Sequence, residues 1–332
     1  MKSGTAVRIA LGLAIALAPL CVWWRVDGTG GAALAASPGA QVTAKACVTT
    51  ARVSSVIAVP PKPLKETWPE SVMLSPNGRW LAVWAYNALL VRDIRTGRWI
   101  RNFGAVFTPR WHPSQPVLMV TGGSADKPVF YSACVTSGRK RQLFRADFHP
   151  FAWCRSGLIW QWGVIDLARS GEQGVSSRNF GYRIPWDHDL IVHMASGPGD
   201  QVVVEFRRSA ERESGPRRWV ETYRQVPGRM QWVGVGRILP NREAAMISEY
   251  AMNPAFLRNG EVTYLRTHQQ GGYALWAAAL DGKKQRMLAV LPDFQPYATG
   301  AQADWYTLDP QGKTVYYLSG KKIRVVRLQS PR

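Results

Sequence analysis

Acidic residues, histidines and cysteines are all scarce in this chain of 332 residues. It has 22 Asp and Glu, 5 His and 4 Cys against 42 Lys and Arg, and its formal net charge is +20. So few acids and histidines leave little material for a catalytic carboxylate pair or a metal centre. The positive charge instead favours acidic proteins, anionic polymers or anionic membranes as partners.

Several motifs of catalysis and metal binding are also missing. The chain has no G-x-S-x-G sequence, which argues against a serine hydrolase domain, and no C-x-x-C pair. The densest ligand-like cluster, Asp187-His188-Asp189, is interpreted as a solvated loop. His112 and His149, each followed by Pro, are interpreted as turn residues. We therefore predict no metal and no other cofactor.

Helical periodicity is not evident beyond the N-terminal segment. There, Lys2 and Arg8 precede an apolar run at residues 9–24, and the small-residue sequence ALAA follows at 33–36. This pattern predicts that residues 1–36 form a signal peptide and that the protein is periplasmic or secreted. The alternative is an uncleaved anchor in the inner membrane formed by residues 9–24, which would be the chain's only membrane contact.

A short pattern recurs along the rest of the chain at intervals of roughly 40 to 60 residues. An apolar or aromatic residue is followed by three turn residues, usually a Gly, and then a β-branched or aromatic run. The copies begin at Leu74, Trp111, Trp153, Ala195, Phe256 and Leu308. This spacing suits four-stranded propeller blades, so we predict an all-β, six-bladed β-propeller, with five to seven blades possible.

Two of these copies carry a resemblance to a known family. LSPNGRWLAV at Leu74 and LDPQGKTVYYLSGKKIRVVRL at Leu308 resemble the blade repeat of TolB-like propellers, the WD-like repeat proteins that bacteria export. The similarity extends over about residues 70–328 as a periodic pattern. At the Asp of the family motif this chain has Asn77, Ser114, Ser156, Asn259 or Gln311. The resemblance implies a protein or peptide partner in the cell envelope.

The ends of the repeat region predict how the propeller closes. The last copy has three evident strands, and the β-branched run at residues 53–59 could supply the fourth. The predicted organisation is therefore a signal or anchor at 1–36, an N-terminal strand and Pro-rich linker at 37–69, and the propeller at 70–332.

Tryptophan and cysteine have two interpretations each. Most of the 15 Trp residues lie within the repeats, where packing between sheets requires large side chains, so core packing is favoured over ligand stacking. Cys134 and Cys154 map to one face of neighbouring blades, and a disulfide between them is as plausible as two buried thiols.

Basic residues form the recurrent surface feature, and they cluster in turns. The candidate binding residues are Arg139, Lys140, Arg141, Arg207, Arg208, Arg217, Arg218, Lys283, Lys284, Lys321 and Lys322. Because they map to both faces of the propeller, no specific nucleic-acid groove is predicted, and a solvated basic surface is favoured over a specific polyanion site.

These observations favour an exported, non-enzymatic propeller that acts as a protein-binding platform or scaffold, and the positive charge favours an acidic partner. Two alternatives stay open. One is a metal-dependent propeller hydrolase or lactonase with a site at the channel mouth, and the other is an envelope protein that binds an anionic polymer.

Overall fold

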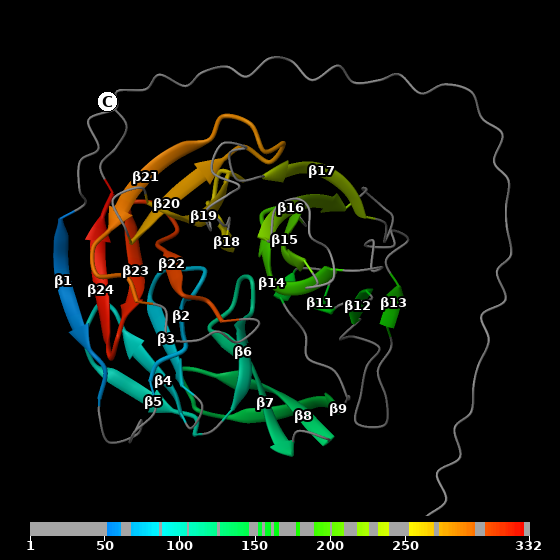
Figure 1. Ribbon diagram of the computed structural model, residues 1–332. Helices are drawn as coiled ribbons and strands as arrows, with labels where there is room; N and C mark the ends of the chain where they lie inside the picture. Colours follow the sequence, from blue (N-terminus) through cyan, green and yellow to red (C-terminus); the bar gives the residue numbers. More distant parts are fainter. Residues whose placement is uncertain are drawn as a thin grey trace, which may run out of the picture. The chain divides into compact units, whose positions relative to one another are not determined.

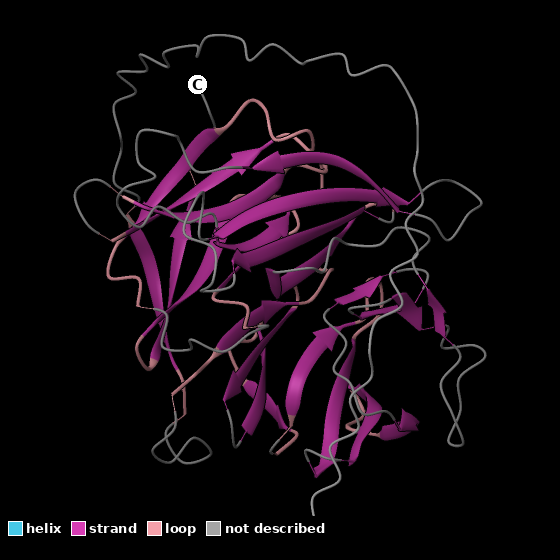
Figure 2. Ribbon diagram, turned by 45° about the vertical axis from the view of Figure 1, so that its right-hand side comes forward, coloured by secondary structure: helices cyan, strands magenta, loops and turns pink. Residues whose placement is uncertain are grey.

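Every secondary-structure element that the computed structural model describes is a β-strand, as Figure 2 shows. The described residues are 52–60, 68–85, 88–104, 106–124, 127–145, 152–154, 157–160, 163–165, 177–179, 189–199, 201–208, 218–225, 232–238, 252–268, 272–295 and 303–328. The predicted signal segment at 1–36 lies outside them. Within the described part of the chain, no helix could cross a membrane.

The strands form six four-stranded antiparallel sheets. The first three, each in hydrogen-bonding order, are β2 (Ser71–Leu74), β3 (Trp80–Ala85), β4 (Ala88–Asp93) and β5 (Trp99–Asn102); β6 (Phe107–Trp111), β7 (Val117–Ser124), β8 (Lys127–Cys134) and β9 (Lys140–Arg145); and β10 (Ala152–Cys154), β11 (Gly157–Trp160), β12 (Gly163–Ile165) and β13 (Ser177–Asn179).

The next two sheets have the same order of strands along the chain. They are β14 (Asp189–Gly197), β15 (Gln201–Arg208), β16 (Arg218–Gln225) and β17 (Trp232–Ile238); and β18 (Met252–Phe256), β19 (Val262–Thr267), β20 (Tyr273–Ala278) and β21 (Arg286–Leu291). The sixth sheet joins β22 (Tyr306–Leu308), β23 (Thr314–Ser319) and β24 (Lys322–Arg327) to the N-terminal strand β1 (Val53–Ala58).

The repeated turn lies between the first and second strand of each sheet. Its glycines have positive φ, with values of 72° at Gly78, 85° at Gly260 and 67° at Gly312, which explains why Gly recurs there. At the first copy, Ser75 Oγ donates to Asn77 Oδ1 (2.8 Å) and accepts from the Trp80 amide (2.9 Å). These residues fix the hairpin, as the sequence pattern predicts.

The sheets pack side by side around a common centre, as Figure 1 shows. Hydrophobic clusters join the first sheet to the second, the second to the third, the fourth to the fifth, the fifth to the sixth, and the sixth back to the first. Between the third and fourth sheets, Ser196 Oγ donates to the Trp153 carbonyl (2.8 Å). First strands of neighbouring sheets contact one another in four places, β2 with β22, β6 with β10, β10 with β14 and β14 with β18, and therefore line the centre. This arrangement confirms the predicted all-β propeller.

Strand β1 pairs antiparallel with β24, with Val56 opposite Arg324 and Ile57 opposite Ile323. Its Ile57 packs on the hydrophobic cluster between the sixth and first sheets. A strand from the beginning of the propeller thus completes the sheet formed by its end. The large aromatic residues Trp84 and Trp153 are 9% and 7% exposed, which confirms that they are core residues.

Candidate functional site

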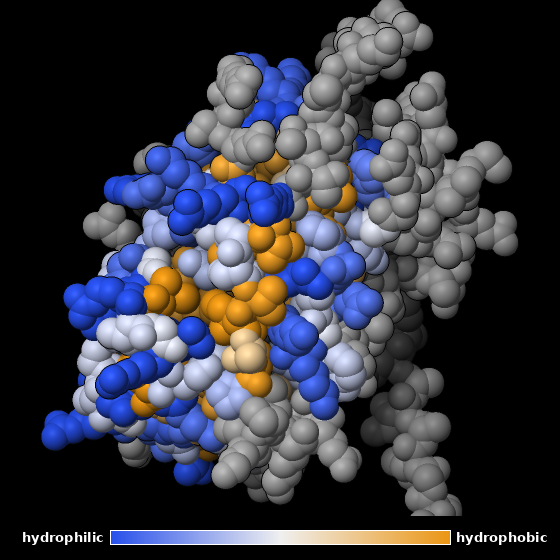
Figure 3. All heavy atoms as spheres, turned by 90° about the vertical axis from the view of Figure 1, so that its left-hand side faces the viewer, coloured by the Kyte–Doolittle hydropathy of each residue, from blue (hydrophilic) through white to orange (hydrophobic). Residues whose placement is uncertain are grey.

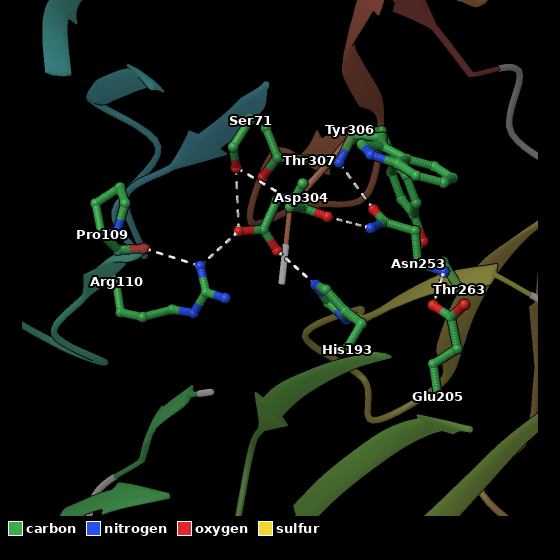
Figure 4. Close-up of polar contacts among 12 residues, drawn as sticks. Ser71, Pro109, Arg110, His193, Glu205, Asn253, Thr263, Asp304, Tyr306 and Thr307 are labelled. Carbon is green, nitrogen blue, oxygen red and sulfur yellow. Dashed lines mark hydrogen bonds and ion pairs between the residues drawn. The ribbon is translucent and has the colours of Figure 1, made fainter. Parts of the chain in front are cut away.

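Polar side chains from five sheets meet at the centre of the propeller (Figure 4). Asp304, which precedes β22, accepts from Arg110 Nη1 of β6 through Oδ2 (3.2 Å) and contacts His193 Nε2 of β14 through Oδ1 (2.9 Å). Its amide donates to Ser71 Oγ of β2 (2.9 Å). Next to it, the Trp305 amide donates to Asn253 Oδ1 of β18 (2.9 Å). We call Ser71, Arg110, His193, Asn253 and Asp304 the central cluster.

The electrostatics of the central cluster favour a charged Asp304. Its side chain is only 23% exposed, and that of Arg110 only 8%. Burial by itself raises the pKa of Asp304, but the charge of Arg110 and the hydrogen bonds from His193 and Ser71 outweigh burial and lower this pKa below its ordinary value. Burial also lowers the pKa of Arg110, and the Asp304 charge opposes that change.

These contacts fill the centre with polar groups, most of which are paired, although His193 Nδ1 is buried and has no hydrogen-bond partner among the described residues. Glu205 Oε2 of β15 accepts from the Asn253 amide (2.7 Å), so the network continues outward into a second strand. Buried polar groups that are paired in this way specify one arrangement of their supporting strands. The central cluster therefore positions the first strands relative to each other.

The sequence did not reveal the central cluster, because Asp304 is 194 residues from Arg110 and 111 from His193 along the chain. The histidine interpreted as a turn residue, His112, accepts through Nδ1 from the amides of Ser114 and Gln115 (both 3.2 Å), which confirms that interpretation. Asp187, His188 and His149 lie outside the described residues, and only the backbone of Asp189 is described.

Among the described residues, no three His, Cys, Asp or Glu side chains are grouped so that they could hold a metal ion. Cys134 is a free thiol whose Sγ lies 3.2 Å from Thr136 Oγ1, which is one of the two alternatives that the sequence left open for it. Hydrogen bonds from Ser137 and Thr136 lower the pKa of the Cys134 thiol to about 7. The side chain of Cys154 is not described, and its pairing with Cys134 on oxidation stays a prediction.

A second candidate site is formed by the turns between first and second strands and between third and fourth strands. Antiparallel connection places both kinds of turn at the same end of each sheet. Turns of neighbouring sheets also lie in contact. A Cβ added at Gly78 in the first sheet would lie only 2.9 Å from Pro310 Cδ in the sixth sheet, and one added at Gly312 in the sixth sheet would lie 2.9 Å from Leu257 Cδ2 in the fifth. The exposed cations of these turns, which we call the basic turn face, are Arg79, Arg95, Arg98, Arg139, Lys140, Arg258, Lys283, Lys284 and Lys313.

The acidic side chains described on the same turns are engaged locally. Asp281 Oδ1 accepts from the Lys283 amide (2.9 Å), Asp309 Oδ1 from the Lys313 amide (2.7 Å) and Asp93 Oδ1 from the Arg95 amide (2.8 Å). Glu261 Oε2 accepts from Arg286 Nη2 (2.6 Å). These carboxylates shape the turns, and the exposed cations outnumber them, although Arg79 also pairs with Asp93 (3.5 Å) and Lys140 donates to the Phe103 carbonyl (3.1 Å).

The structure brings only some of the predicted basic residues together. Arg139, Lys140, Lys283 and Lys284 belong to the basic turn face, and Arg141 is exposed on the adjoining strand β9. The residues at the opposite ends of the sheets are Arg207 and Arg208 at the end of β15, Arg218 at the start of β16, Lys321 between β23 and β24, and Lys322 at the start of β24. Arg217 lies outside the described residues.

Five members of the basic turn face were not identified from the sequence: Arg79, Arg95, Arg98, Arg258 and Lys313. A signal was present for three of them, Arg79, Arg98 and Lys313, because a cation directly follows the turn glycine in Gly78-Arg79, Gly97-Arg98, Gly138-Arg139, Gly282-Lys283 and Gly312-Lys313. Each of these glycines has positive φ and so marks a tight turn. Positive charge therefore recurs directly after the glycine in these five turns, whereas Gly199 and Gly260 are followed by acids.

No protein-family model matches the chain, and no curated protein matches it significantly. Among solved structures, it is similar to hydrazine synthase of Kuenenia stuttgartiensis, with 14% identity over 75% of this chain and 72% of that one, and a TM-score of 0.45. It is also similar to TolB of Acinetobacter baumannii, with 10% identity over 78% of this chain and 54% of that one (TM-score 0.35). The β-propeller domain of the trilobed protease of Pyrococcus furiosus shows 10% identity over 80% and 93%, and a TM-score of 0.45.

Proposed function

We propose that the chain is a non-enzymatic β-propeller that binds an acidic surface of a partner protein through its basic turn face, and that it acts in the bacterial cell envelope. The observation that supports binding is the excess of exposed cations on turns whose acids are already engaged. Such a patch attracts acidic surfaces and disfavours basic ones. The envelope location rests on the export-type segment at residues 1–36.

The test is capture of partners from an envelope extract with the full chain and a pair of matched variants. Lys283→Glu/Lys284→Glu reverses two charges on the basic turn face, and Arg207→Glu/Arg208→Glu reverses two at the end of β15, at the opposite end of the sheets. We expect the first variant to lose the captured protein and the second to keep it, with binding that weakens as salt rises. Equal loss in both variants, or no loss in either, would contradict the proposal.

Mass spectrometry of the captured chain would also read its mature N-terminus, which tests export. Metal analysis with a thermal-shift screen of divalent ions tests the enzymatic alternative. A stoichiometric ion that stabilises the protein would overturn the non-enzymatic proposal.

An anionic polymer is the second candidate ligand, since the same exposed cations would bind it. Its test is retention on a heparin column at physiological salt. If the Lys283→Glu/Lys284→Glu variant loses retention while no acidic protein is captured, the polymer replaces the protein as the ligand.

A further inference from the structure

The outermost strand of the sixth sheet, β1, has an edge to which no described strand pairs. The hydrogen-bonding order of this sheet is β1, β24, β23 and β22, so β1 uses one side of its main chain to pair with β24. The other side presents amide and carbonyl groups in an extended conformation. Such an edge is a template for a further strand unless side chains block it.

The other five outermost strands each contain a Lys or Arg in their sequence, and β1 contains no charged residue. Natural proteins commonly place charged residues on edge strands, because a charge disfavours pairing with another chain. The sequence of β1 is VSSVIA, which has no charged residue and no Pro. The cations in the sequences of these strands include Arg101 in β5, Lys140 in β9, Arg178 in β13, Arg237 in β17 and Arg286 in β21.

Strand β1 is also unusually apolar for an exposed strand. Among the described residues, the large hydrophobic side chains that are clearly exposed are Val56 in β1, at 49%, and Val233 in β17, at 42%. Figure 3 shows hydrophobic side chains on the side of the molecule where β1 lies, with hydrophilic ones around them. Val233 shares its strand with the cation Arg237, whereas no charge accompanies Val56 within β1.

The charges beside β1 indicate what could pair with it. Arg324 lies directly opposite Val56 and Lys322 opposite Ala58, so two cations stand one strand inward from the edge. Asp293 pairs with Arg324 (2.6 Å) and offsets part of this charge. A second copy of the chain would bring the same cations and a net charge of +20 to the contact, which is repulsive. An acidic strand would meet complementary charge.

From these observations we infer that the outer edge of β1 is a docking site for an extended, acidic polypeptide strand of a partner protein, which adds to the sixth sheet beside β1. Main-chain hydrogen bonds supply the affinity in this mode of binding, and alternate side chains supply the selectivity. The Val56 side chain would contact apolar residues of the added strand. This site is separate from the basic turn face and does not depend on it.

The test uses the full chain and a short synthetic peptide in which valine alternates with glutamate. In one analogue the valine amides are N-methylated, and in the other the glutamate amides are. Each analogue therefore lacks the N–H donors along one edge of the extended peptide. We expect the unmodified peptide to bind in a calorimetric titration, one analogue to lose binding and the other to keep it. A peptide with lysine in place of glutamate should bind at least about tenfold more weakly.

Protein variants locate the site. Val56→Glu places a negative charge on the edge and should weaken the acidic peptide about tenfold, whereas Val233→Glu adds the same charge to another outermost strand and should leave binding unchanged. Equal binding of both N-methyl analogues, equal effects of the two variants, or no binding of the acidic peptide would overturn the inference. A dimer of the chain that Val56→Glu dissociates would also overturn it, because the occupant would then be a second copy. The N-methyl comparison needs no variant, so it decides the question even if Val56→Glu does not fold.

Discussion

At the scale of single residues, Asp304 has the largest number of distant partners in the central cluster. It contacts Arg110 from the second sheet, His193 from the fourth and Ser71 from the first. Its lowered pKa means that the folded protein binds a proton at Asp304 less readily than the unfolded chain does. The stability from this group is fully present above the unfolded pKa of about 3.9 and is lost as the pH falls through the lower folded value.

Asp304→Asn keeps the shape of the side chain but removes the negative charge that faces Arg110 and His193. Because breaking a buried ion pair is costly, we expect the free energy of unfolding at pH 7 to fall by about 3 kcal/mol in urea denaturation. Loss of stability on acidification should also become shallower. Asp309→Asn is the matched control, since an amide oxygen can still accept from the Lys313 amide. Equal stability of Asp304→Asn and the wild type at pH 7 would contradict a stabilising role for the ion pair.

At the scale of elements, the fourth and fifth sheets approach each other through glycine. A Cβ at Gly236 of β17 would lie 2.3 Å from the Asp281 carbonyl carbon, and one at Gly282 would lie 2.4 Å from the Arg237 carbonyl oxygen. In the same place Thr222 Oγ1 donates to the Leu280 carbonyl. The turn between β20 and β21 therefore rests on β17 with main chain against main chain, at a distance that a side chain would prevent.

Gly282→Ala should destabilise the protein for two reasons, its φ of 78° and its contact with Arg237. Gly104→Ala separates the two, because Gly104 has a similar φ of 75° but no atom within 4 Å of the position of a Cβ. We expect Gly104→Ala to cost about 1 kcal/mol and Gly282→Ala at least about 2 kcal/mol more, measured by thermal and urea unfolding. If Gly104→Ala and Gly282→Ala lowered the free energy of unfolding equally, the close contact between Gly282 and Arg237 would add no penalty of its own.

The elements also show what could be predicted from sequence. Each turn of the repeat is a local hairpin, so Leu74 to Trp80 or Leu308 to Thr314 contains the information that forms it. The central cluster could not be predicted, because Arg110, His193 and Asp304 come together only when separate sheets assemble. The basic turn face is predictable in part. Each of its turns is local in sequence, but their charges come to share one face only when the sheets assemble into a ring.

At the scale of the whole molecule, β1 links the beginning of the propeller to its end. Ile57 is opposite Ile323 and packs against the cluster between the sixth and first sheets, which includes Val72 and Leu318. If β1 were removed from this cluster, the sixth sheet would lose its outermost strand and the cluster would lose part of its cover. The stability of the ring is therefore expected to depend on a strand far from the rest of its sheet in sequence.

Ile57→Asp tests this dependence, with Val56→Asp as the control on the same strand. The first substitution places a carboxylate in the cluster between the sheets, whereas Val56 is 49% exposed and its replacement leaves the charge in water. We expect Ile57→Asp to lower the free energy of unfolding by about 3 kcal/mol and Val56→Asp by no more than about 0.5 kcal/mol. Hydrogen exchange should show lost protection in β24 and in β2 for Ile57→Asp alone. If exchange rises only within β1 and the unfolding transition does not move, β1 is an appendage of the propeller and not the strand that closes it.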